Sequence, residues 1–141
     1  RGAIMGLTRG TNRGHIARAA LEAVCLQTRD VVEAMKASLK FPLTEMRVDG
    51  GMAANNLLLQ MQADLLGLPV LRPRVTETTA LGAAFLAGLA AGMYRSTDEI
   101  ASLWRADRAF EPSLSSDRRD ILYERWRMAV ASVRRYKPRA R

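Results

Sequence analysis

The chain turns from an expected strand into an expected helix at Asp49-Gly50-Gly51-Met52-Ala53-Ala54-Asn55-Asn56. The apolar residues of 43–48 precede this stretch and predict a short strand. The apolar pattern of 55–66 predicts a helix, and Gly67 follows it as a plausible C-terminal cap. Together with the elements expected on either side, this stretch gives an order of strand, helix, strand and helix, which indicates an α/β fold.

Residues 49–55, here called the glycine loop, are also the strongest candidate for a binding site. Because glycine lacks a Cβ atom, two glycines at a strand end let the backbone approach a ligand closely. The free N–H groups of a helix's first turn favour an anion or a polar ring edge, and Asn55 would offer both a donor and an acceptor there. Gly-Gly before a helix is also a common structural turn, so the residues alone leave both interpretations open.

The segments around the glycine loop complete the α/β pattern. Residues 2–14 predict a short strand or extended segment followed by a loop. A long helix begins near His15 and ends before Phe41-Pro42, because proline disfavours helical geometry in the residue before it. Residues 69–71 predict a second short strand, and residues 72–77 a loop that Pro73 interrupts.

Three helices are expected in the second half of the chain. The first runs from Ala80 to about Ala91, with Thr78 or Thr79 as its N-cap and Gly92 after its end. The second runs from Ser96 or Thr97 to the break at Glu111-Pro112. The third begins at Ser115 or Ser116. Glycine inside a helix costs about 1 kcal/mol relative to alanine. Gly82 and Gly88 therefore predict close packing of the first of these helices on a neighbour.

Composition and charge fit a globular chain. The 141 residues are 48% hydrophobic and carry a net charge of +8, which argues against a disordered, collagen-like or coiled-coil protein. Residues 1–40 hold seven basic and three acidic side chains, residues 41–100 four and six, and residues 101–141 eleven and five. The arginines of the last segment surround a helical apolar pattern, so a solvated helix face is expected rather than a nucleic-acid patch.

The remaining candidates for chemistry are weak. His15 and Cys25 are the single residues of their types, so we expect neither a metal site nor a complete catalytic set. His15 is expected to cap a helix and Cys25 to pack in the core. The uncharged stretch 78–94 is too short and too rich in Ala and Gly for a membrane span. Residues 8–13 are expected to form an exposed basic loop, and the start at Arg1 is expected to lie inside a longer polypeptide.

Two separated segments resemble a known signature. Gly2-Ala3-Ile4-Met5-Gly6-Leu7, followed after seven residues by His15-Ile16-Ala17-Arg18-Ala19-Ala20-Leu21-Glu22, is similar to the second signature of the FGGY carbohydrate kinases. Residues 27–35, 47–51 and 79–84 resemble the members that phosphorylate glycerol. The resemblance implies part of the C-terminal actin-like ATPase (ribonuclease H-like) lobe, with helices packed on a small sheet and a C-terminal helix at the end.

The resemblance also implies how the chain is divided and what it does. Residues 1–95 would be the nucleotide-binding part of the lobe, 96–136 its helical extension and 137–141 a basic tail. The whole enzyme would transfer the γ-phosphoryl group of ATP, with Mg²⁺ bound through the nucleotide, to glycerol. Gly51 and Asn55 would contact the adenosine and Gly50 would shape the turn, whereas the catalytic aspartate and the glycerol contacts would lie upstream of Arg1.

Further expectations follow from the same resemblance. The chain alone should lack kinase activity, because phosphoryl transfer needs groups from both lobes. The complete protein should be a cytoplasmic homo-oligomer without a membrane span. A kinase for a pentulose, gluconate or another polyol is the alternative within the family. A basic module that binds nucleic acid without catalysis is the alternative from another class.

Overall fold

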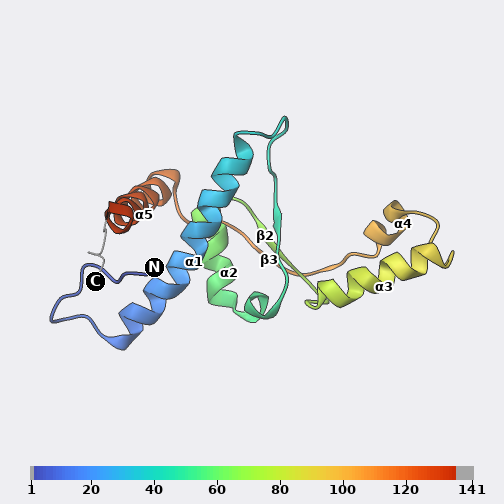
Figure 1. Ribbon diagram of the computed structural model, residues 1–141, viewed down its shortest axis with the longest axis horizontal. Coiled ribbons are helices and arrows are strands. Elements are labelled where there is room, and N and C mark those ends of the chain that lie inside the picture. Colours follow the sequence, from blue (N-terminus) through green and yellow to red (C-terminus); the bar gives the residue numbers. More distant parts are fainter. Residues whose placement is uncertain (1, 136–141) are drawn as a thin grey trace, which may run out of the picture.

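The computed structural model describes residues 2–135, which form one small sheet with helices on one side of it and a helical arm (Figure 1). The elements in chain order are α1 (Arg13–Lys36), β1 (Met46–Arg47), the 3₁₀ helix η1 (Gly51–Ala54), α2 (Asn56–Leu66), β2 (Val70–Pro73), α3 (Thr78–Ala90), α4 (Thr97–Ser102), β3 (Ala106–Phe110) and α5 (Ser116–Arg135). The α/β class and the C-terminal helix predicted from the sequence are confirmed.

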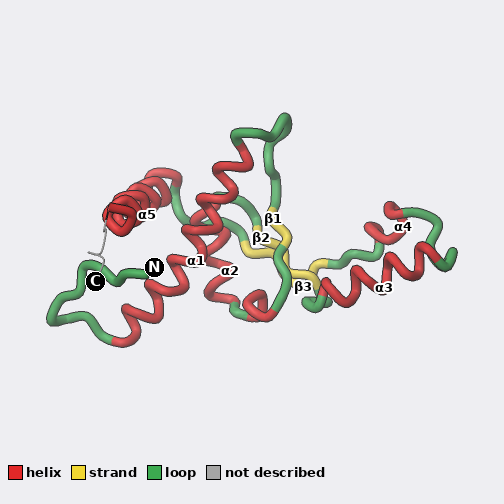
Figure 2. The backbone as a smooth tube through the Cα atoms, in the orientation of Figure 1, coloured by secondary structure: helices red, strands yellow, loops and turns green. Residues whose placement is uncertain are grey.

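The sheet has three strands in the order β1-β2-β3. β1 runs parallel to β2, with Met46 beside Val70, and β2 runs antiparallel to β3, with Val70 beside Phe110. Figure 2 shows the strands together at the centre of the molecule, between the helices and the arm. Because β1 and β2 are parallel, the loops that follow them meet at one edge of the sheet.

Helix α2 lies between the sheet and the other helices. Its Leu59 and Ala63 pack with Val70 and Phe110 of the sheet. Its opposite face, which includes Leu58, Met61 and Leu65, packs with Cys25 and Leu26 of α1 and with the partly buried Leu122, Tyr123 and Trp126 of α5. The core is therefore built in layers, in the order sheet, α2, and then α1 with α5.

Specific residues mark the start of α1 and the end of α2. Asn12 caps α1, since its Oδ1 accepts hydrogen bonds from the backbone N–H groups of Gly14 and His15. His15 Nδ1 accepts one in return from the Asn12 N–H at 3.2 Å, which forms a capping box. The expectation that His15 caps a helix is confirmed. At the far end of α2, Gly67 adopts φ +67° and bonds back to Ala63, as predicted for a C-terminal cap.

A polar cluster, here called the α5 clamp, fastens α5 to α1. Arg29 donates to the Arg119 carbonyl at 3.0 Å and to the Asp120 carboxylate at 2.7 Å. Asp30 accepts hydrogen bonds from the Tyr123 hydroxyl and the Trp126 indole, each at 2.7 Å. The predicted solvated face of this helix is confirmed for five exposed arginines, namely Arg118, Arg125, Arg127, Arg134 and Arg135. The predicted basic tail, residues 137–141, lies outside the described residues.

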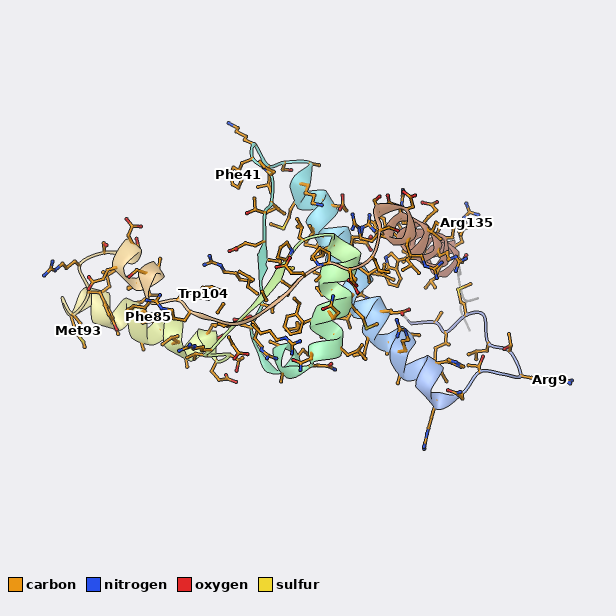
Figure 3. The ribbon with its side chains drawn as sticks, turned by 180° about the vertical axis from the view of Figure 1, so that it is seen from behind. Arg9, Phe41, Phe85, Met93, Trp104 and Arg135 are labelled. Atoms are coloured by element: carbon orange, nitrogen blue, oxygen red, sulfur yellow. The ribbon has the colours of Figure 1, made fainter. Side chains whose placement is uncertain are left out.

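Helices α3 and α4 form an arm that extends from the sheet on the side away from α5 (Figure 1). Phe85 and Tyr94 meet edge to face there, with ring centroids 5.6 Å apart. The predicted close packing of α3 on a neighbouring element is not confirmed. A Cβ atom at Gly88 would lie 2.7 Å from the Tyr94 ring, but Tyr94 belongs to the turn directly after α3. At Gly82 nothing lies within 4 Å of such an atom in the described residues. Figure 3 shows Phe85 and Met93 on this arm and Arg135 at the opposite end of the molecule.

Three details of the sequence prediction were wrong. The helix that begins after Ser96 ends at Ser102, and residues 106–110 form strand β3 where we expected helix. Helix α3 begins at Thr78 with Glu77 in the cap position, so neither Thr78 nor Thr79 is its N-cap. Strand β2 continues through Arg72 and Pro73, where we expected the loop to begin. Of the two alternatives for the start of the chain, residues 2–12 contain no strand, which leaves the extended segment and loop. No helix among residues 2–135 is long and apolar enough to cross a membrane.

Candidate functional site

The loops that follow β1 and β2 lie side by side because the two strands are parallel. The backbone N–H of Gly50 donates to the carbonyl of Thr76 at 3.0 Å. The hydroxyl of Thr78, in the first turn of α3, donates to a carboxylate oxygen of Asp49. These two bonds join the glycine loop to the start of the arm. The place is the edge of an α/β sheet at which ligands commonly bind, outside the carboxyl ends of parallel strands.

Gly50 gives the glycine loop its shape. Its φ of +80° lies in the region that side chains with a Cβ atom rarely adopt. Space is not the constraint, since no atom of residues 2–135 lies within 4 Å of a Cβ atom built at Gly50 or at Gly51. The turn then enters η1, whose first internal bond joins the Ala53 N–H to the Gly50 carbonyl at 3.0 Å. The N–H of the exposed Gly51 precedes that bond, so it is available to a ligand.

The two polar atoms of the Asn55 side chain differ in their contacts: the oxygen caps α2 and the nitrogen is open to a ligand. Its Oδ1 accepts a hydrogen bond from the Leu58 N–H at 3.1 Å, which makes Asn55 the N-cap of α2. Its Nδ2 makes no hydrogen bond within residues 2–135, and the side chain is exposed. The loop therefore presents a backbone donor at Gly51 and an amide donor at Asn55 on one short turn, a set suited to a polar ring edge.

Arg72 supports this turn from the neighbouring strand, and the sequence analysis missed it. Its Nη1 donates to the Ala53 carbonyl at 3.2 Å and to Asn56 Oδ1 at 2.9 Å. Its Nε and Nη2 contact Asp107 Oδ2 at 2.8 and 2.7 Å. The one signal in the sequence was an arginine inside a short apolar segment, immediately before Pro73.

The other sequence candidates lie away from the glycine loop. His15 is at the start of α1, and Figure 3 shows Arg9 at the end of the molecule that holds this helix start. Cys25 is buried, and its thiol donates to the Leu58 carbonyl at 3.6 Å. Burial, with a smaller contribution from Glu22, raises the pKa of this thiol from 9.0 to about 11. Such a thiol is protonated at neutral pH and is a poor nucleophile.

Comparison with known proteins gives one consistent family. Residues 1–91 match the model of the FGGY family of carbohydrate kinases, C-terminal domain. A glycerol kinase from Dechloromonas aromatica is 61% identical over 130 residues, which are 92% of this chain and 26% of that protein. The solved structure of a Plasmodium falciparum glycerol kinase with ADP covers 92% of this chain with a TM-score of 0.81 and 32% identity, and 26% of its own chain is covered.

A second branch of the family shares the fold at lower similarity. The structure of a xylulose kinase from Rhodospirillum rubrum covers 92% of this chain with a TM-score of 0.75 and 26% identity, and 27% of its own chain is covered. The chain thus spans about a quarter of the length of each of these relatives.

Proposed function

The chain belongs to the FGGY family of carbohydrate kinases, and we propose that it is the nucleotide-binding portion of the C-terminal lobe of a glycerol kinase. The single observation that carries this proposal is the 61% identity to a glycerol kinase over 92% of the chain. The glycine loop, at the carboxyl ends of parallel strands, is a suitable place for the nucleotide. The full-length protein would then transfer the γ-phosphoryl group of ATP to glycerol.

We place the adenosine of ATP or ADP against the glycine loop. The Gly51 N–H and the Asn55 amide supply donors to the nucleoside, and Gly50 shapes the turn that presents them. The Plasmodium falciparum relative was solved with ADP and shares this fold, which supports a nucleotide as the ligand. The free donors on an exposed turn support this place for it.

The proposed reaction is an in-line displacement at phosphorus. A terminal hydroxyl oxygen of glycerol forms a bond to the γ-phosphorus, the bond from that phosphorus to the β,γ-bridging oxygen breaks, and ADP leaves while the hydroxyl proton passes to a base. In this proposal residues 1–141 supply the nucleotide contacts, and the remainder of the polypeptide supplies the base and the glycerol contacts. The chain alone should therefore form no ADP in response to glycerol.

Magnesium is expected to enter the proposed reaction with the nucleotide. Among residues 2–135 no three His, Cys, Asp or Glu side chains are grouped so as to hold a metal ion. Asp49, the carboxylate of the glycine loop, accepts a hydrogen bond from the Thr78 hydroxyl. From the family membership we propose that Mg²⁺ reaches this part of the enzyme as a complex with the nucleotide phosphates.

The domain limits and the setting of the enzyme are also proposals. Residues 1–95 would be the nucleotide-binding part and residues 96–136 a helical extension. The extension contains β3, which pairs with β2 of the first part. The full-length protein would act in the cytoplasm as a homo-oligomer. Light scattering on the purified full-length protein tests the oligomer, and a monomer at micromolar concentration would contradict it.

A substrate panel tests the proposed function. Full-length protein with Mg-ATP should form ADP in the presence of glycerol, and much more slowly with xylulose or gluconate. Activity with xylulose or gluconate and none with glycerol would contradict the proposal. It would indicate a pentulose or gluconate kinase of the same family instead. Residues 1–141, assayed beside the full-length protein, should form no ADP with glycerol.

A further inference from the structure

Arg72 is the residue that joins the glycine loop to the rest of the sheet. Arg72 lies in β2. Its guanidinium binds the junction of η1 and α2 through the Ala53 carbonyl, and it binds the Asp107 carboxylate of β3. The side chain is 16% exposed, and a guanidinium so largely desolvated needs partners for its donors. The carboxylate of Asp107 supplies one partner, and the two groups beside Asn55 supply the others.

The contacts of Arg72 lie on both sides of Asn55. Ala53, whose carbonyl it binds, comes two residues before Asn55, and Asn56, whose Oδ1 it binds, comes immediately after. Ala53 is also buried, at 2% exposure, so its peptide group is held by packing as well. Because η1 extends only from Gly51 to Ala54, fixing its third residue restricts the orientation of the Gly51 N–H in the same turn.

We propose that Arg72 is a positioning residue for nucleotide binding: it holds Ala53 and Asn56 so that Gly51 and Asn55 meet the nucleoside in one fixed orientation. Asp107 in turn orients Arg72. This inference rests on the proposed function, since it names a residue that acts through the proposed nucleotide contacts. Lysine could not replace arginine here, because its donors all lie on one nitrogen, whereas Arg72 uses Nη1 for Ala53 and Asn56 and Nε with Nη2 for Asp107.

The test is a set of variants in the full-length protein. Arg72→Gln and Arg72→Lys should each raise the Michaelis constant for ATP about tenfold. Loss of one charge-assisted hydrogen bond weakens binding by about this factor. The Michaelis constant for glycerol and kcat at saturating ATP should stay close to wild type. Asp107→Asn, which keeps the volume and leaves Arg72 in place, should raise the ATP constant by a smaller factor.

The matched control is Arg29→Gln. Arg29 is 11% exposed and, like Arg72, binds a carbonyl, a carboxylate and an aromatic face. It belongs to the α5 clamp and does not touch the glycine loop. Its loss should lower the thermal stability of the protein while the ATP constant remains near wild type. If Arg29→Gln and Arg72→Gln raise the ATP constant equally, Arg72 is only structural and the inference is overturned.

Asn55→Ala separates failure of the inference from failure of the proposed function. A rise of the ATP constant in Asn55→Ala without one in Arg72→Gln would refute positioning and leave the nucleotide site in place. No rise in either variant would remove the proposed site itself. In the double variant, Arg72→Gln should raise the ATP constant by a smaller factor than it does alone, because part of its effect is exerted through Asn55. Fully additive effects would mean that Arg72 acts elsewhere.

Discussion

Replacing Asn55 by aspartate and by alanine separates its structural role from its proposed binding role. Aspartate keeps an oxygen acceptor at the N-cap of α2 and removes the amide donor, whereas alanine removes both. In the structure the acceptor is used by the Leu58 N–H at 3.1 Å, and the donor is free for a ligand. The two variants should therefore agree in nucleotide binding and differ in the stability of α2.

The magnitudes follow from these contacts. Loss of an N-cap side chain costs about 1 kcal/mol, so the amide of Leu58 should exchange its hydrogen about fivefold faster in Asn55→Ala. Asn55→Asp should keep the wild-type exchange rate or slow it slightly, because a carboxylate at a helix N-terminus also interacts well with the dipole. Loss of one hydrogen bond to the nucleoside corresponds to about tenfold weaker binding of ADP in both variants.

Two assays on the full-length protein check this pair. Hydrogen exchange followed by mass spectrometry reports on the N-terminal turn of α2, and isothermal titration with ADP reports on binding. If Asn55→Asp binds ADP as wild type does while Asn55→Ala binds weakly, the effect of alanine comes from the lost cap and the proposed amide contact is refuted. Equal exchange at Leu58 in all three proteins would refute the cap.

Three further outcomes follow from the structure. Gly50→Ala should weaken ADP binding in titration, because alanine is strained at φ +80°; unchanged affinity would show that the turn is not needed in this form. Asp30→Asn should destabilise the docking of α5 by about 1–3 kcal/mol, seen as faster hydrogen exchange over 116–135, since Tyr123 and Trp126 both donate to this carboxylate; unchanged protection of α5 would contradict this. Since the unfolded chain releases the Cys25 proton at lower pH than the folded chain, stability should fall as the pH rises from 9.0 to about 11; thermal melts of Cys25→Ala should show a smaller fall, and an identical fall would contradict the assignment.

The parts of the fold that sequence predicted well are those governed by local rules. α1 and α2 have strong apolar periodicity and end signals that act within a few residues, such as Gly67 at the end of α2. The shape of the glycine loop follows the same principle, because Gly50 takes the positive φ that the glycine pair allows. The prediction that Gly51 and Asn55 bind a nucleotide stays a prediction.

The parts that sequence missed depend on partners distant in the chain. β3 has four exposed residues and only Phe110 buried, so it lacks the apolar alternation by which a strand is found. Its backbone pairs with β2, more than thirty residues earlier, and this pairing overrides the helical tendency of the segment. Arg72 was overlooked for the same reason, because its role depends on Ala53, Asn56 and Asp107, none of which is adjacent in sequence.

A crystal structure of the full-length protein with ADP is the most direct test of the central claim. We predict that the adenosine lies against the glycine loop, with the Gly51 N–H and Asn55 Nδ2 within hydrogen-bond distance of it and with Arg72 still bound to Ala53 and Asn56. Nucleotide density that lies away from residues 49–55 would contradict the assignment of this chain as the nucleotide-binding portion of the kinase.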